Sequence, residues 1–316
     1  MYKTFFDLKA NPFGSSPDPR FLYVMPHVRE ALAGLEYGIS ARKGFIVLVG
    51  EVGTGKTTLL RSAIDSFDGN RVFVSFIFNP RLDALDLLEL ILTDFGIKPE
   101  ARTKSGMLLQ LNRFVLDCFR RDETCVIVID EAQNLSADLL EEVRLLTNLE
   151  TATEKLLQII LCGQPELEDK LRQPNLRQLR QRIALWCRTQ ALTAEQTAAY
   201  ITGRLAIAGS STQIFSPEAV AAIHRISRGI PRIVNLLCEH SLILAYVEQL
   251  RVIPAGIINA VSRDLDLETQ PIRASSSSLL NTEVSMKSDT TEKTDKTDVL
   301  QEDFTTSETL PGGLES

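Results

Sequence analysis

This 316-residue sequence has few histidine, cysteine and aromatic residues: 3 His, 5 Cys and 6% aromatic residues with a single Trp. The cysteines stand singly within apolar segments, without a C-x-x-C pair or a Cys/His metal spacing. This pattern argues against a zinc or redox site and predicts buried thiols in a reducing compartment. The five are Cys118, Cys125, Cys162, Cys187 and Cys238.

Long apolar runs are also missing. No run approaches the roughly 18 residues of a membrane-spanning helix. Residues 1–9 carry charges where a signal peptide would need its apolar stretch. We therefore expect a cytoplasmic protein without a transmembrane segment.

The sequence also lacks an excess of basic residues. The formal net charge is −7, and residues 271–316, with four Lys/Arg and nine Asp/Glu, contribute −5 of it. Residues 1–270 are therefore near −2, so no general positive field attracts nucleic acid or an anionic membrane.

The sequence does contain a complete phosphate-binding loop with the pattern G-x-x-x-x-G-K-T. The loop consists of Gly50, Glu51, Val52, Gly53, Thr54, Gly55, Lys56 and Thr57. An apolar run at 45–49 leads into it as a strand, and 58–65 leaves it with helical spacing, which is the context the pattern requires. The glycines let backbone N–H groups converge on an anion, and the helix adds the positive end of its dipole. We expect Lys56 to reach the β- and γ-phosphates, Thr57 to hold Mg²⁺, and Thr58 to lie in the same site.

An acid pair, Asp130 and Glu131, ends a second apolar run at 125–129. A run that is apolar throughout is typical of a parallel strand covered on both faces, and ligands of open α/β sheets bind at the carboxyl ends of such strands. We expect Asp130 to hold Mg²⁺ through water and Glu131 to polarise the attacking water. The alternative is that the two acids only begin a loop and cap the next helix. The phosphate-binding loop upstream favours the catalytic interpretation.

Strand and helix patterns alternate up to about residue 190 and predict a parallel α/β sheet with right-handed crossovers. The expected strands are 45–49, 72–78, 125–129, 156–162 and 183–187. Beyond residue 190, helical patterns follow one another at 194–208, 216–227, 231–248 and 256–265. The predicted domains are an α/β domain with an N-terminal lead-in at 1–190, a helical lid at 191–268, and a disordered, acidic, Ser/Thr-rich tail at 269–316.

Two polar positions favour contacts with a terminal phosphate. Gln164 follows the fourth expected strand, where it would hydrogen-bond the γ-phosphate or the attacking water; the alternative is a turn residue before a helix at Pro165. Arg232 begins a lid helix on a segment expected to move. The same position also suits a plain helix start with proline near its first turn.

The densest positive stretch has no acid within it. It comprises Arg172, Arg177, Arg180, Arg182 and Arg188. Three interpretations stay open: an arginine finger for a neighbouring subunit, which adds about 10³–10⁵ in rate, a contact with a nucleic-acid backbone, or a solvated face with ion pairs.

These motifs, in this order, resemble the AAA+ ATPases and, more narrowly, the ExeA-type (general secretion pathway protein A) family over roughly residues 1–265. The matching segments are 1–2 with 5–6, 11–13, 17–23, 50–57, 129–134, 163–167, 176–182 and 229–232. The resemblance implies ATP and Mg²⁺ as ligands, a P-loop NTPase sheet of order 5-1-4-3-2, and an ATP-dependent homo-oligomer.

The resemblance also implies roles for single residues. Gln164 and Arg232 correspond to the first and second sensors. One arginine among Arg177, Arg180 and Arg182 corresponds to the finger. In AAA+ proteins the segment before the first helix often lines the adenine pocket, a place that Asn11, Pro12 and Phe13 take here.

Secretion-pathway members of this family carry a membrane span and a peptidoglycan-binding domain after the ATPase. This sequence shows neither, and it is more similar to short members from exosortase, exopolysaccharide and mannose-sensitive pilus loci. We expect an ATP-hydrolysing oligomeric motor or switch that supports secretion, exopolysaccharide or pilus assembly, with envelope or secretion-machinery partners and peripheral contact with the inner membrane. The alternatives are a DNA-associated ATPase of the transposition-regulator or initiator type, and a switch that binds ATP with little turnover, against which Glu131 argues.

Overall fold

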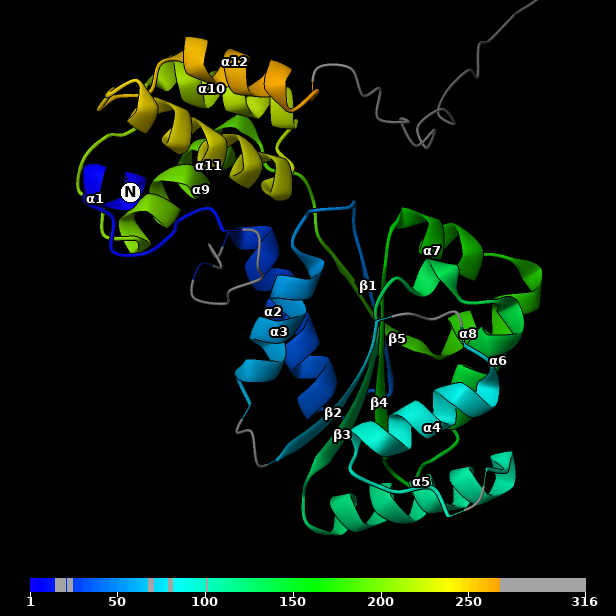
Figure 1. Ribbon diagram of the computed structural model, residues 1–316. Helices are drawn as coiled ribbons and strands as arrows, with labels where there is room; N and C mark the ends of the chain where they lie inside the picture. Colours follow the sequence, from blue (N-terminus) through cyan, green and yellow to red (C-terminus); the bar gives the residue numbers. More distant parts are fainter. Residues whose placement is uncertain (15–20, 22–24, 68–70, 79–81, 101, 268–316) are drawn as a thin grey trace, which may run out of the picture. The chain divides into compact units, whose positions relative to one another are not determined.

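The computed structural model describes residues 1–14, 21, 25–67, 71–78, 82–100 and 102–267 (Figure 1). The predicted tail at 269–316 lies outside the described residues. The strands are β1 (Phe45–Val49), β2 (Val72–Ile77), β3 (Thr124–Ile129), β4 (Leu157–Gly163) and β5 (Ile183–Arg188). The helices before residue 190 are α1 (Tyr2–Phe5), α2 (Pro26–Ser40), α3 (Lys56–Asp65), α4 (Ala84–Asp94), α5 (Lys104–Arg120), α6 (Ala137–Leu146), α7 (Pro165–Leu171) and α8 (Arg177–Arg182), with 3-10 turns η2 (Ala132–Asn134) and η3 (Pro174–Leu176). The later helices are α9 (Ala194–Ile207), α10 (Pro217–Ser227), α11 (Pro231–Val247) and α12 (Ala255–Asp264).

Five parallel strands form one sheet in the order β2-β3-β4-β1-β5, which confirms the predicted order 5-1-4-3-2. The register pairs Val49 with Gly163 and Ile129 with Leu161, so the carboxyl ends of β1, β3 and β4 lie together. All residues of β1 and β4 are buried. Burial on both faces explains why these strands are apolar without alternation.

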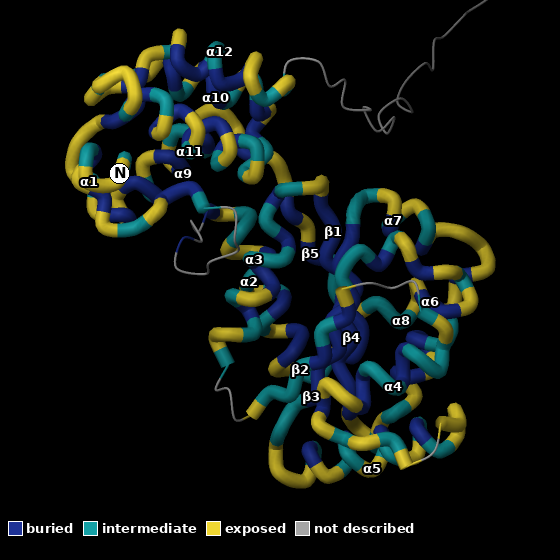
Figure 2. The backbone as a smooth tube through the Cα atoms, viewed as in Figure 1, coloured by how far each residue is buried: buried dark blue, intermediate teal, exposed yellow. Residues whose placement is uncertain are grey.

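Helices cover both faces of the sheet (Figure 1). Successive side chains point to opposite faces of a strand, so Val47 and Ile127 pack in a core with α4–α8, whereas Ile46 and Val126 pack in a core with α2 and α3. Figure 2 shows the strands as the buried layer between these helices. The layers hold the carboxyl ends of the strands in fixed positions, which is where the candidate site lies.

The helices α9–α12 share a third apolar core, and residues from the start of the chain belong to it. Phe6, Leu8 and Phe13 are buried there, and the Phe13 ring makes an edge contact with Phe215 at 6.2 Å between centroids. A capping box between Thr193 and Gln196 fixes the start of α9. The predicted domain boundary at residue 190 stays a prediction.

The expected elements all occur, with ends that differ by one or two residues. Helix α3 begins at Lys56 instead of residue 58, because Gly55 adopts φ 94° and serves as its N-cap. Helices α1 and α8 were not expected from the sequence, since four and six residues are too short to show a helical period. All five cysteines are buried and unpaired, as predicted. Within the described ranges, no helix combines the length and the apolar character needed to cross a bilayer.

Candidate active site

The phosphate-binding loop joins β1 to α3, and its glycines have conformations or surroundings that a side chain would disturb. Gly53 and Gly55 have φ of 80° and 94°, where other residues are strained. A Cβ at Gly50 would lie 2.0 Å from Thr189 Oγ1, whereas the space around Gly55 is open. The loop therefore packs tightly on its protein side and leaves room on the side of the α3 N-terminus.

Lys56 is the first residue of α3, and its side chain is folded over the loop. It is 7% exposed, and Nζ donates to the carbonyl oxygens of Gly50 at 2.8 Å and Glu51 at 3.1 Å. Thr54 Oγ1 also donates to the Glu51 carbonyl, at 2.7 Å. The ammonium is thus held at the mouth of the loop, close to the free N–H groups of a helix N-terminus.

The sheet brings Thr57 and Asp130 together across 73 positions of sequence. Thr57 Oγ1 donates to Asp130 Oδ2 at 3.2 Å. The other carboxylate oxygen, Oδ1, accepts from the backbone N–H of Glu131 at 2.9 Å, which fixes the carboxylate at the end of β3. Hydroxyl and carboxylate oxygens of this kind are the ligands that Mg²⁺ prefers. No cluster of three or more His, Cys, Asp or Glu side chains suited to a metal occurs in the described part of the chain.

Glu131 follows Asp130 in the left-handed conformation, at φ 52°. Its Oε2 accepts from Gln133 Nε2 at 2.5 Å and from Gln164 Nε2 at 3.1 Å. Burial raises the pKa of this carboxyl, but the hydrogen bonds from the two glutamines and the charge of Lys56 outweigh burial, so the pKa is lower than usual. Glu131 is therefore ionised at neutral pH, as a group that polarises water must be.

Arg232 lies at the start of α11 and lines the same cavity as the phosphate-binding loop. Its backbone N–H donates to the Gly53 carbonyl at 3.1 Å, so α11 contacts the loop directly. Before it, Gly229 has φ 74°, and a Cβ there would lie 2.0 Å from the Leu192 carbonyl oxygen. The sequence G-I-P-R therefore closes a tight link between α10 and α11.

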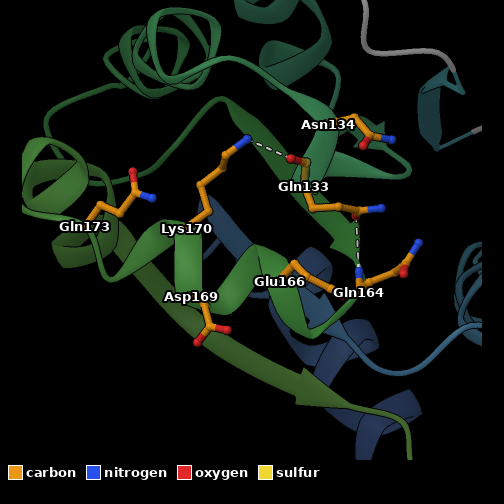
Figure 3. Close-up of a pocket in the computed structure, with 7 residues that line it drawn as sticks. All are labelled: Gln133, Asn134, Gln164, Glu166, Asp169, Lys170 and Gln173. Atoms are coloured by element: carbon orange, nitrogen blue, oxygen red, sulfur yellow. Dashed lines mark hydrogen bonds between the residues drawn. The ribbon is translucent and has the colours of Figure 1, made fainter. Parts of the chain in front are cut away.

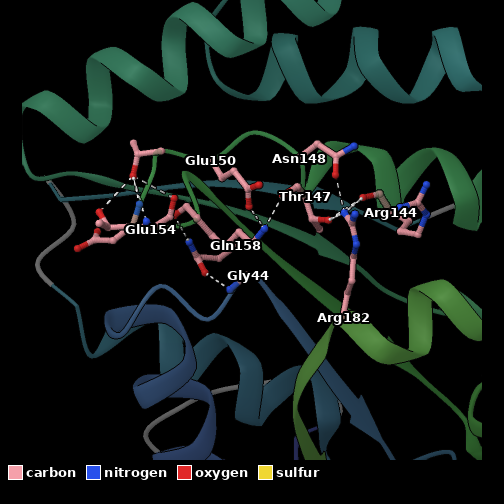
Figure 4. A network of polar contacts seen from close by, with 11 residues as sticks. Gly44, Arg144, Thr147, Asn148, Glu150, Glu154, Gln158 and Arg182 are labelled. Carbon is pink, nitrogen blue, oxygen red and sulfur yellow. Dashed lines mark hydrogen bonds and ion pairs between the residues drawn. The ribbon is translucent and has the colours of Figure 1, made fainter. Parts of the chain in front are cut away.

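The three candidate finger arginines lie outside this cavity. Arg182 donates through Nη1 to Thr147 Oγ1 and Asn148 Oδ1, both at 2.6 Å, and belongs to a polar network at the amino-terminal edge of the sheet (Figure 4). Arg177 and Arg180 are exposed on α8, and no ion pair or side-chain hydrogen bond is found for them among the described residues.

The two flanking arginines have ordinary partners. Arg172 forms ion pairs with Glu168 and Asp169, and Arg188 pairs with Glu168. Arg188 also lies over the Trp186 ring, 5.8 Å from its centroid. For these two residues the structure favours the solvated face with ion pairs.

The cavity has a volume of about 950 Å³ and collects most of the predicted site residues. These are Asn11, Phe13, Val52, Gly53, Thr54, Gly55, Lys56, Thr57, Thr58, Asp130, Glu131 and Arg232. Gly50, Glu51, Pro12 and Gln164 do not line it. Pro12 instead accepts a hydrogen bond from Arg204 Nε at 2.6 Å, and Gln164 borders a neighbouring open cleft (Figure 3).

Sequence reasoning missed several cavity residues on α9 and α11. Glu239 accepts from Tyr2 OH at 2.8 Å and Asn11 Nδ2 at 3.1 Å through Oε1, while its buried Oε2 has no hydrogen-bond partner among the residues that the structure describes. Burial is the main cause of a raised pKa of Tyr2, and its hydrogen bond to Glu239 raises this pKa further. Glu239 lies seven residues after Arg232, on the same helix face. That spacing is the one signal in the sequence that could have identified it.

Three comparisons find proteins that are similar to this chain. A family model described as an AAA domain matches residues 39–171. General secretion pathway protein A of Aeromonas hydrophila is 41% identical over 266 residues, which cover 84% of this chain and 48% of that protein, so the chain spans about half the length of this curated relative. Among solved structures, Cdc6p of Pyrobaculum aerophilum superposes with a TM-score of 0.60 at 20% identity, covering 78% of this chain and 70% of that chain. ORC2 of Aeropyrum pernix, in its ADPNP and ADP complexes, gives 0.58 at 15% identity, covering 80% and 74%. At these identities the structural likeness shows the fold alone.

Proposed function

Because the chain belongs to the ExeA-type family of AAA+ ATPases, we propose that it binds ATP with Mg²⁺ and hydrolyses it. One observation carries the proposal: the Thr57 hydroxyl, 3.2 Å from the Asp130 carboxylate, lies in the same cavity as Lys56 and Glu131. A loop that bound phosphate without hydrolysing it would need no second acid. Here Glu131 is present in addition to Asp130, which accepts the hydrogen bond from Thr57.

The residues present fit a magnesium nucleotide. The open space at Gly55 and the N-terminus of α3 suit an anion, and Thr57 and Asp130 supply hard oxygen ligands. Mg²⁺ bound there would neutralise charge on the β- and γ-phosphates. Lys56 would exchange its hydrogen bonds with the Gly50 and Glu51 carbonyls for bonds to the phosphates.

Glu131 is the residue we assign to the attacking water. Its Oε2 accepts hydrogen bonds from two glutamines, which leaves Oε1 to accept a hydrogen bond from the water. Polarising the water in this way typically contributes 10²–10⁴-fold to a rate. Gln164, beside Glu131, and Arg232, beside Gly53, are proposed to contact the γ-phosphate as the first and second sensors.

The base-binding end of the cavity is assigned to Asn11, Phe13 and Glu239. The partnerless Oε2 of Glu239 is a hydrogen-bond acceptor, and adenine presents an amino donor on the edge where guanine presents a carbonyl oxygen. An acceptor at this position favours ATP over GTP, because a carboxylate has no hydrogen to give to the guanine oxygen.

We further propose that hydrolysis requires a second copy of the chain. Arg177 and Arg180 lie outside the nucleotide cavity of their own chain and have no partners among the described residues, so either is available as a finger for a neighbouring subunit. Arg182 is less suited, because its guanidinium already binds Thr147 and Asn148.

For the cellular role, we propose that the ATPase supports an envelope assembly or export system from the cytoplasmic side, with contact at the inner membrane. The name of the Aeromonas relative, general secretion pathway protein A, supports this assignment. Exopolysaccharide and pilus assembly are related export tasks that would use the same ATPase chemistry.

The test is ATP hydrolysis measured as a function of protein concentration, with and without double-stranded DNA. We expect turnover per subunit to rise with protein concentration alone. Lys56→Ala should abolish ATP binding, and Glu131→Gln should keep binding while lowering turnover by at least about 100-fold. A rate that stays low until DNA is added would instead support the DNA-associated alternative, and a wild type as slow as Glu131→Gln would support the switch.

A further inference from the structure

Gln133 forms hydrogen bonds with both Glu131 and Gln164. The roles assigned to the phosphate-binding loop and to the acid pair do not include this residue. It belongs to the 3-10 turn η2, directly after β3. Its Nε2 donates to Glu131 Oε2 at 2.5 Å, and its Oε1 accepts from the backbone N–H of Gln164 at 3.1 Å. One amide group therefore connects the carboxylate at the end of β3 to the end of β4.

The surrounding structure is arranged to admit this amide. A Cβ at Gly163 would lie 2.8 Å from Gln133 Oε1, so a larger residue at the end of β4 would displace the side chain. From the other side, Lys170 Nζ donates to the backbone carbonyl of Gln133 at 2.7 Å (Figure 3). It also donates to the Leu135 carbonyl at 2.6 Å. Side chain and backbone of Gln133 are thus each fixed by a separate element.

We propose that Gln133 is a positioning residue for ATP hydrolysis, which holds the Glu131 carboxylate so that one oxygen stays directed at the attacking water. The proposal rests on the proposed ATPase function. Glu131 needs such support because its carboxylate has side-chain donors only in Gln133 and Gln164 among the described residues. Without the bond from Gln133, the carboxylate would keep only the longer bond from Gln164, at 3.1 Å.

The Gln133 amide also affects the charge of Glu131. A donor that bonds to the charged form favours that form, in agreement with the lowered pKa of Glu131, where the bonds from Gln133 and Gln164 offset the effect of burial.

Gln133→Glu is the decisive variant. A glutamate at 133 keeps an oxygen for the Gln164 N–H, so the link to β4 remains, but it replaces the donor to Glu131 with a second carboxylate. Two ionised carboxylates repel each other, so the Glu131 carboxylate would be displaced from its position. We expect kcat to fall about tenfold or more at neutral pH, and KM for ATP to change less than about threefold because Gln133 does not line the nucleotide cavity.

Two further variants separate positioning from a structural effect. Gln133→Leu removes both hydrogen bonds at similar volume and should lower kcat with the same small change in KM. Gln173→Leu is the matched control, because Gln173 lines the same cleft without a hydrogen bond to Glu131 or Gln164; it should behave as the wild type. Thermal melting confirms that each variant is folded.

Either of two results would overturn the inference. The first is a Gln133→Glu protein with wild-type kcat. The second is a loss of kcat in Gln133→Leu that goes together with a lower melting temperature and with a KM for ATP raised by a similar factor, which would make Gln133 a purely structural residue. A wild type that binds ATP without hydrolysing it at any protein concentration contradicts the proposed function itself, and the inference fails with it.

Discussion

At the scale of single residues, arginines a few positions apart have quite different surroundings. Arg182 donates to two side chains of the segment after α6, and its Nη1 also lies 3.4 Å from the Arg144 carbonyl. Arg180 lies two residues earlier on the same short helix, α8. It is exposed and has no side-chain partner in the described structure. From the sequence these arginines could not be distinguished as candidates for the finger, because the partners of Arg182 lie 34–38 positions earlier in the chain.

The two arginines should therefore respond differently to truncation. Arg182→Ala leaves a hydroxyl and an amide oxygen without their donor and should lower the free energy of unfolding by about 1–3 kcal/mol, measured by urea denaturation. Arg180→Ala should leave unfolding unchanged and reduce the concentration-dependent turnover by about 10³-fold if it is the finger. Arg177→Ala is the parallel variant, since it is equally exposed. An Arg182→Ala protein with wild-type stability and no turnover would reverse this assignment.

At the scale of elements, the short link before α11 connects the nucleotide cavity to the helices α9–α12. Leu192 N–H donates to the Gly229 carbonyl at 2.8 Å, and Arg232 N–H donates to the Gly53 carbonyl at 3.1 Å. Two backbone hydrogen bonds thus join the start of α11 to the segment after β5 and to the phosphate-binding loop. The link is tight enough that its glycine has no room for a side chain.

Gly229→Ala should damage this link more than a surface substitution would. Positive φ alone costs a non-glycine residue about 1–2 kcal/mol, and the Leu192 backbone, 2.0 Å from the new methyl group, must also move. We expect a lower melting temperature together with weaker ATP binding, measured by calorimetry. Gly256→Ala is the control, because nothing lies within 4 Å of its Cβ position in α12; it should keep wild-type ATP affinity.

The elements themselves were largely predictable from the sequence, for physical reasons that differ along the chain. Strands β1 and β4 are apolar throughout because both faces are covered, and that signal is local. The bonds of Gln133 to Glu131 and Gln164 were not predictable, because they depend on η2, which has no periodic pattern, and on space left by Gly163. Glu239 accepts a hydrogen bond from Tyr2, 237 positions away, and no local pattern reveals this contact.

At the scale of the whole molecule, the cavity is bordered by the α/β elements, by α9 and α11, and by the N-terminal segment. A ligand that contacts all of these stabilises the folded state by RT ln(1 + [L]/Kd), about 2.7 kcal/mol at 100 times Kd. For a protein of this size, that corresponds to a rise in melting temperature of roughly 5–10 °C.

We therefore expect ATP with Mg²⁺ to raise the melting temperature by this amount, measured by differential scanning fluorimetry. Lys56→Ala should remove the shift, and GTP should give a smaller one, because the Glu239 carboxylate cannot donate to guanine. Equal shifts with ATP and GTP would contradict the assignment of Glu239 to the base.

The packing of residues 1–14 against the last helices also has a consequence for synthesis. Pro12 and Arg204 are 192 positions apart, and Tyr2 and Glu239 are 237 apart. At about 5–20 residues per second, a ribosome needs roughly 10–40 s to extend the chain from Pro12 to Arg204. Leu8 and Phe13 lack their partners on the later helices for all of that time, so this segment stays exposed as apolar surface on the nascent chain. The cavity is complete only after α11 has been synthesised, so a partly synthesised chain lacks part of the site that we propose for ATP.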